Sequence, residues 1–147
     1  MTVRTFRTLV AVAVGFGLTL PLVVRAADVA GAVATPKADV KWADAGIPGV
    51  KTAAVQGDMA KGASHFFLKY PAGLVTPVHH HSPDHYATTL SGSLVLVVNG
   101  KEQRLPPGSY FSLTGKAAHA ARCEGSEDCV MFIDARGPWD VVPEKKP

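Results

Sequence analysis

The chain has 147 residues, two of them cysteines, and its 15 lysines and arginines outnumber its 12 aspartates and glutamates by three. The excess basic charge lies within the first 26 residues, at Arg4, Arg7 and Arg25, so the rest of the chain balances at 12 basic and 12 acidic residues. A neutral chain of this length suits one domain with a hydrophobic core and lacks the basic surface that nucleic-acid binding requires, which excludes nucleic acid as a partner.

Residues 1–26 have the pattern of a secretory signal peptide. A short basic start precedes an apolar run over residues 9–24, and Val24 and Ala26 stand at the two positions that signal peptidase inspects. A retained membrane anchor is the alternative, but the apolar run is shorter than the ~20 residues that a membrane-spanning helix needs. We therefore expect cleavage after Ala26, a secreted or periplasmic mature protein of 121 residues (147 less 26), and no stable membrane anchor.

After the signal peptide, the sequence predicts a short lead and one all-β domain. Residues 27–45 are rich in small residues without a clear period, and we interpret them as a flexible N-terminal lead. Residues 46–147 predict a sandwich or barrel, because short apolar runs alternate with glycine, proline and asparagine. The strand-like runs cover residues 64–70, 85–90, 93–98, 101–105, 109–113, 117–122 and 129–134. Asn99-Gly100 is a strong hairpin signal, because both residues tolerate a positive φ.

Cys123 and Cys129 are the two cysteines, and the five residues between them include Gly125 and Ser126. In an exported chain they predict a disulfide that closes a tight loop, because an oxidising compartment lets such a bond persist. A free thiol pair or a pair of metal ligands are the alternatives, since spacing alone does not fix the geometry that a disulfide requires.

Five of the six histidines gather in two places, residues 79–85 and position 119. In an extended strand His79 and His81 point to one side and His80 to the other. His85 follows a turn-like Ser-Pro-Asp stretch and can swing back toward the same point, and a neighbouring antiparallel strand can bring His119 opposite them.

Converging imidazoles are good ligands for transition metals, and a set that leaves coordination positions open is what catalytic metals require. We predict one divalent transition-metal ion (Zn, Fe, Mn, Ni or Cu) on His79, His81, His85 and His119. We interpret His65 and His80 as surface or hydrogen-bonded histidines.

The first histidine group resembles the first motif of the cupin family. Gly73, His79, His81, His85 and Gly92 have the spacing of that motif, although the family usually places a glutamate where this chain has His85. Four neutral histidines would leave the ion its full charge and favour an anionic substrate or a bound hydroxide. Some cupins use only three histidines, so His85 need not be a ligand.

The stretch from Gly108 to Cys123 is similar to the second cupin motif. His119 keeps its distance from Gly108, while Thr114, Lys116 and Cys123 stand where the family usually has proline, glycine and asparagine. The resemblance implies a single cupin barrel, the double-stranded β-helix or jelly roll. The chain looks like small exported single-domain cupins of unassigned function and, more distantly, like the cupin lobe of zinc anti-sigma factors.

Several residues around the motifs are candidates for a supporting role. We place Asp84 second to His85 as a ligand and expect it to orient a ligand instead. Tyr86 and Glu102 are the nearest acid–base candidates, although nothing in the sequence fixes their direction. Small residues on the ligand face predict a roomy lumen above the metal: Ala87, Thr89, Ala117 and Ala121. Trp42 and Trp139 are expected to pack in the core or at the rim. The phenylalanines within the strand-like runs are expected in the core: Phe66, Phe67, Phe111 and Phe132.

Two functions fit these expectations. The first is a metal-dependent enzyme, dioxygenase-like or isomerase-like, acting on a small organic molecule in the lumen. The second is a non-catalytic metal- or ligand-binding protein, such as a sensor, with a closed zinc-type site. Because cupins often pair through their outer sheets, a homodimer is a further expectation.

Overall fold

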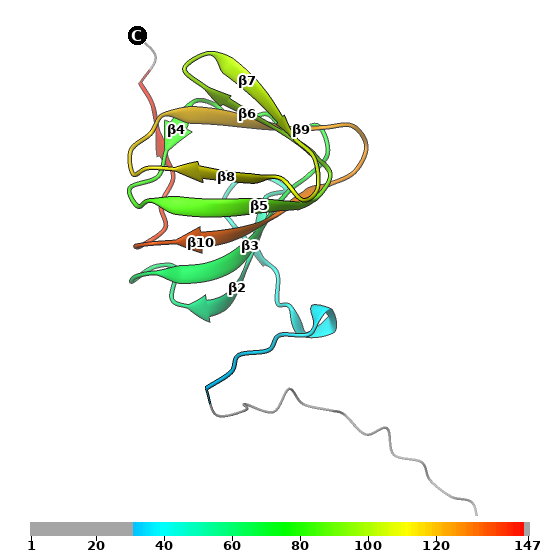
Figure 1. The fold of residues 1–147 in the computed structure, drawn as a ribbon, viewed down its shortest axis with the longest axis vertical. Helices are drawn as coiled ribbons and strands as arrows, with labels where there is room; N and C mark the ends of the chain where they lie inside the picture. The colour runs from blue at the N-terminus through cyan, green and yellow to red at the C-terminus, as the bar shows by residue number, and fades with distance from the viewer. Residues whose placement is uncertain (1–30, 146–147) are drawn as a thin grey trace, which may run out of the picture.

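The computed structural model describes residues 31–145, and the predicted signal peptide lies outside them. The chain forms two antiparallel sheets that face each other (Figure 1). One sheet has the order β1-β2-β3-β10-β5-β8 and the other the order β11-β4-β9-β6-β7. The strands are β1 (Ala43–Asp44), β2 (Lys51–Gly57), β3 (Ser64–Tyr70), β4 (His79–His80), β5 (His85–Ser91), β6 (Ser93–Val98), β7 (Lys101–Leu105), β8 (Tyr110–Leu113), β9 (His119–Glu124), β10 (Cys129–Ala135) and β11 (Val142–Pro143). This arrangement confirms the predicted all-β jelly roll.

The seven predicted strand runs are all present, with ends that move by no more than two residues. The predicted hairpin is also present, because Asn99 and Gly100 have φ values of 50° and 72° and join β6 to β7. The sheet begins before the predicted domain start at residue 46, since Ala43–Asp44 pairs with β2. A single 3-10 turn, η1 (Lys37–Asp39), precedes it. Within residues 31–145 there is no helix long and apolar enough to cross a membrane.

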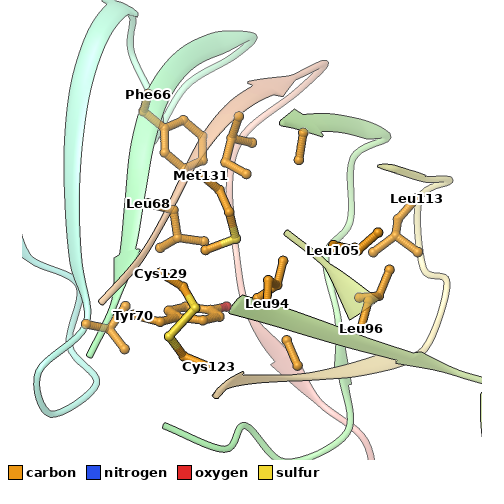
Figure 2. Close-up of a cluster of buried hydrophobic side chains, with 14 of the residues drawn as sticks. Phe66, Leu68, Tyr70, Leu94, Leu96, Leu105, Leu113, Cys123, Cys129 and Met131 are labelled. Atoms are coloured by element: carbon orange, nitrogen blue, oxygen red, sulfur yellow. A yellow bond between two sulfur atoms is a disulfide. The ribbon is translucent and has the colours of Figure 1, made fainter. Parts of the chain in front are cut away.

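Side chains that alternate along the strands fill the space between the two sheets. On β3, Phe66, Leu68 and Tyr70 are buried, the neighbouring strand β10 contributes Met131, and β6 of the facing sheet contributes Leu94 (Figure 2). Apolar burial of this kind is the main stabilising contribution to a domain of this size. The core therefore lies between the sheets, as the alternation of apolar residues predicts.

The prediction that all four phenylalanines are core residues is wrong for two of them. Phe67 and Phe132 alternate with buried neighbours on β3 and β10 and so lie half-buried on the outer face of the sheet. Their rings are 5.8 Å apart, and Trp42 lies 6.3 Å from Phe67. Phe66 is fully buried and Phe111 packs against the core, as predicted.

A disulfide joins Cys123 on β9 to Cys129 on β10, which confirms that prediction. Because β9 and β10 belong to different sheets, the bond ties the sheets together. Both cysteines are buried, and Tyr70 lies beside them (Figure 2). A Cβ on Gly92, at the step from β5 to β6, would lie 2.7 Å from the Asp128 carbonyl oxygen, so only glycine lets the chain pass this close to the disulfide loop.

Candidate metal centre

Three buried histidines, the histidine triad His79, His81 and His119, come together at one end of the barrel. Each offers one ring nitrogen, and these nitrogens all lie within 4.8 Å of one another. The register of β4 against β9 brings two of them together, because His79 on β4 pairs directly with His119 on β9. His81 lies two positions after His79 and shares its side, whereas His80 points away and pairs with Glu144.

Each histidine of the triad is oriented by a carbonyl group of the main chain. Nδ1 of His79 lies 2.9 Å from the Pro77 oxygen, Nδ1 of His119 lies 2.9 Å from the Ala117 oxygen, and Nδ1 of His81 lies 2.5 Å from the Asp140 oxygen. A carbonyl oxygen only accepts, so the proton must sit on Nδ1 in all three rings. The lone pair of each Nε2 is thereby left free for a metal.

The surroundings also keep the rings of His81 and His119 uncharged. Burial lowers the pKa of His81 to about 3, against the opposing effect of the Asp140 carbonyl. Burial likewise lowers the pKa of His119 to about 4. Because metal ligation needs neutral imidazole, the ligand form already predominates at neutral pH.

The donor set of the triad fits one transition-metal ion. Three neutral imidazoles with free Nε2 atoms and bonded Nδ1 atoms are the arrangement that imidazole-binding metals use in proteins. The choice among zinc, iron, manganese, nickel and copper depends on ligands that the triad alone does not fix.

His85 lies beside the triad rather than within it. Its ring centre is 4.9 Å from that of His81 and 6.1 Å from that of His119. Burial lowers the pKa of His85, opposed by the nearby Pro83 carbonyl, but its buried Nδ1 makes no hydrogen bond of good geometry among the described residues. That His85 is a fourth ligand stays a prediction.

The residues predicted for a supporting role make their contacts elsewhere. Asp84 is exposed, and its carboxylate accepts a hydrogen bond of 2.6 Å from the Gly115 N–H. Tyr86 alternates with the buried His85 and lies half-buried under the Arg136 guanidinium. Those two positions therefore serve packing and loop structure rather than the triad.

Glu102 is also turned away from the histidines. It lies on the exposed strand β7 and accepts two hydrogen bonds, of 2.7 and 2.6 Å, from Arg122. The Arg122 guanidinium holds the pKa of the Glu102 carboxyl below its usual range. Glu102 therefore stays ionised on the outer face, which removes it as an acid–base candidate.

Trp139 is a site residue that the sequence reasoning missed. Its ring stacks on His81, with centroids 3.9 Å apart and planes 22° apart, and its edge meets His85 at 5.1 Å. It also contacts Phe66 at 5.0 Å. No spacing pattern links Trp139 to the histidine motifs, so only its aromatic character marked it, and that is equally typical of core packing.

Trp139 begins a C-terminal strap, residues 139–144, that holds the ligand segment in place. Strand β11 of the strap pairs with β4, which is visible as the red segment beside β4 in Figure 1. The Asp140 carboxylate accepts hydrogen bonds of 2.7 and 2.5 Å from the backbone N–H and the hydroxyl of Ser82. Burial raises the pKa of the Asp140 carboxyl, but these hydrogen bonds outweigh that effect and hold the pKa below its usual range.

The open space lies elsewhere than predicted. Ala87 and Thr89 are buried in the packed interior, and Ala121 lines a space of only about 20 Å³ between the histidines and core side chains such as Met131. The prediction of a roomy lumen above these residues is therefore wrong, because larger residues of the facing strands fill it.

A cavity of about 550 Å³ lies instead between β2, β3, residues 74–77 and the C-terminal strap. His79 and His81 both form part of its wall. Two members of the histidine triad therefore face a space large enough for a small organic molecule.

Comparisons with known proteins agree with this architecture. Residues 66–134 match a family model described as a cupin domain. No curated protein matches the sequence. The polyketide cyclase RemF from Streptomyces resistomycificus is similar in structure, with a TM-score of 0.64 and 20% identity over 78% of this chain and 86% of that one.

Two further solved structures are comparable. An RmlC-like cupin protein from Ralstonia eutropha JMP134 has a TM-score of 0.62 and 23% identity, over 78% of this chain and 76% of that one. The DMSP lyase DddQ from Ruegeria pomeroyi DSS-3 has a TM-score of 0.60 and 20% identity, over 74% of this chain and 64% of that one. At these identities the likeness establishes the fold.

Proposed function

The chain belongs to the cupin superfamily, and on that premise we propose that it is an exported metal-dependent enzyme that acts on a small organic molecule. The observation that carries the proposal is the position of the histidine triad, because His79 and His81 are shared between the triad and the wall of the 550 Å³ cavity. A site whose ligands face an open cavity suits chemistry on a bound molecule.

Each part of the site has a defined task in this proposal. The triad holds one divalent transition-metal ion, which when bound supplies a Lewis acid to a substrate oxygen or to water. The Pro77, Ala117 and Asp140 carbonyls keep each Nε2 directed inward. Trp139 covers one face of His81 and limits the access of water to it.

The enzymes among the structural neighbours support this reading at the level of the fold. A cyclase and a lyase share the cupin barrel with this chain. One fold hosts many reactions, so the reaction type is set by the cavity and not by the barrel. The predicted signal peptide and the disulfide support export, because disulfides persist in oxidising compartments.

Elemental analysis tests the proposal directly. The mature protein, residues 27–147, is purified without a polyhistidine tag beside the His81→Ala, His119→Ala double variant. We expect close to one equivalent of metal in the parent and less than a tenth of that in the double variant. The matched control is His65→Ala, since His65 lies on the outer face beside Phe132 and should leave the metal content unchanged.

Absence of metal from the parent, even after reconstitution with each candidate ion, would refute the proposed function. Metal lost equally from the His65→Ala protein would show that binding depends on the number of histidines and not on the triad.

A non-catalytic metal- or ligand-binding protein is the second candidate. The contacts of Tyr86 and Glu102 away from the triad favour it, because these were the predicted acid–base groups. The two candidates differ in whether the ion keeps an exchangeable position. Water-proton relaxation measured on a paramagnetic metal form separates them: enhanced relaxation favours the enzyme, and relaxation like that of a closed complex favours the binding protein.

A further inference from the structure

The walls of the 550 Å³ cavity are mostly apolar. Aliphatic and aromatic side chains form most of its lining, among them Val50, Met59, Leu68, Leu74 and Trp139. These residues come from the segment before β2, the loop between β2 and β3, β3 itself, the loop after β3 and the C-terminal strap, so the apolar surface surrounds a ligand on several sides. A wall of this kind binds by removing apolar ligand surface from water.

Polar groups of the wall are largely engaged with the protein itself. The Thr76 hydroxyl donates to the Ala121 carbonyl oxygen at 3.2 Å and accepts from the Ala121 N–H at 2.8 Å. The Asp140 carboxylate accepts two hydrogen bonds from Ser82. A molecule with many hydroxyl groups would therefore lose hydrogen bonds to water without recovering them in the cavity.

The remaining polar groups of the wall are few. They are the hydroxyls of Thr52 and Tyr70 and the two triad histidines. Burial raises the pKa of Tyr70 to about 12, so its hydroxyl is a neutral hydrogen-bond group at physiological pH. The cavity thus offers a ligand few polar contacts, and the two metal-ligating histidines are among them.

Apart from a metal ion on the triad, the described residues of the wall offer no cation to an anionic molecule. Within residues 31–145 no lysine or arginine lines the cavity, and its one ionisable acid, Asp140, is negative. A phosphate group needs cationic or multiple N–H partners to replace its hydration. Without them a phosphorylated molecule has little to gain from binding here.

The rim of the cavity is apolar as well. Ile47, Val75 and Val141 come from three separate segments, line the cavity and are nevertheless exposed, at 38%, 68% and 44%. Exposed aliphatic side chains that gather at one opening mark an entry for an apolar ligand.

Resting on the function proposed above, we propose that this cavity takes an apolar small molecule of up to about two fused rings that carries a single oxygen donor toward His79 and His81. Phosphorylated molecules and sugars are excluded from it. Hydrophobic contact with the rim and walls supplies the binding free energy, and the oxygen donor sets the orientation.

Four probes of known chemistry test the proposal on the metal-loaded mature protein. They are 1-naphthol, 1-naphthoate, 1-naphthyl phosphate and glucuronate, titrated by isothermal calorimetry. We expect 1-naphthol and 1-naphthoate to bind with a Kd below about 100 µM, and the other two at least thirtyfold more weakly. Quenching of Trp139 fluorescence in a Trp42→Phe background reports whether binding occurs in this cavity.

A pair of matched variants tests the role of the rim. Val75→Arg should weaken 1-naphthol at least tenfold and strengthen 1-naphthyl phosphate, because it adds a cation to an apolar entry. Leu90→Arg changes a similarly exposed aliphatic residue on β5, outside the cavity, and should change neither affinity. Val141→Arg repeats the test from the other side of the rim should the first variant fold poorly.

The outcomes separate this inference from the proposed function. Naphthol and naphthoate binding with the predicted preference, in a protein that takes up metal, supports both. Binding of 1-naphthol in preference to glucuronate and 1-naphthyl phosphate, in a protein that takes up no metal, supports the apolar cavity and refutes the metal-dependent function. Metal uptake together with equal or tighter binding of glucuronate or 1-naphthyl phosphate, or with no naphthol binding, overturns the inference and leaves the metal site standing.

Discussion

The titration of individual histidines determines how the metal-free protein responds to acid. His81 and His119 are buried and neutral in the folded chain, with pKa values lowered to about 3 and about 4. In the unfolded chain the same residues take up protons near pH 6.5. Below that pH the unfolded state therefore binds more protons than the folded state, and the free energy of unfolding falls as the pH falls.

We predict a loss of about 2 kcal/mol from His81 alone between pH 6.5 and pH 5 in the metal-free protein. Urea unfolding at pH 7.5, 6.5, 5.5 and 5.0 in the presence of a chelator measures it. The His81→Gln, His119→Gln variant should show a shallower dependence, because neither glutamine titrates. Parallel pH dependences for the two proteins would contradict the neutral, buried state of His81 and His119.

Two strands and the C-terminal strap position the triad histidines in different ways. Strands β4 and β9 bring His79 and His119 together by direct pairing, and the C-terminal strap adds the hydrogen bond to His81. The strap is itself held by Asp140, whose carboxylate bonds Ser82 next to the ligand. The side chain of Asp140 thus acts on the metal site through the position of His81, as a positioning residue.

We predict that Asp140→Ala lowers metal affinity roughly tenfold to a hundredfold, because the strap loses its anchor beside His81. Competition with a chelator of known affinity measures the loss. Glu102→Ala is the matched control, since it removes an acidic residue whose contacts lie with Arg122 on the outer face. Unchanged affinity in Asp140→Ala, or an equal loss in Glu102→Ala, would mean that the strap does not position the triad.

Much of the fold could be predicted from strand-length runs and turn residues, and the triad from the alternation of His79 and His81 and its spacing to His119. Strand β2 was not predicted, because its sequence lacks a strong apolar alternation and buries only Ala53. The contribution of Trp139 depends on a strap that returns from the chain's end, a long-range contact without a local signal. The predicted position of the cavity was wrong for a similar reason, since the side chains of facing strands decide which small residues have open space above them.

In the whole molecule, the histidine triad and the disulfide lie at opposite ends of β9, and only the disulfide joins the two sheets. The histidine triad gathers β4 and β9 at one end, while the disulfide joins β9 to β10 at the other. Cys123 lies four residues along β9 from His119, about 13 Å at the rise of a strand. Stability and metal binding should therefore be separable.

We predict that replacing both cysteines, Cys123→Ala and Cys129→Ala, lowers the free energy of unfolding by about 2–4 kcal/mol, because the unfolded chain gains freedom and buried sulfur is lost. Metal content measured well below the melting temperature should stay close to one equivalent. Reduction of the parent protein, which leaves the sulfur atoms in place, provides the control for the lost packing. Loss of the metal in the folded double variant would show that the two ends are coupled.

The acceptors that orient the triad all belong to the main chain, at Pro77, Ala117 and Asp140. A main-chain carbonyl survives every amino-acid replacement, so mutation at 77 or 117 does not delete the acceptor as long as the backbone path is kept. Substitutions at these positions therefore leave the tautomers of the three triad histidines unchanged. Proteins that evolve from this one can therefore change many of the residues that flank the histidines and still keep the orientation of the ligands. The path of the backbone, more than the identity of the flanking side chains, preserves this centre.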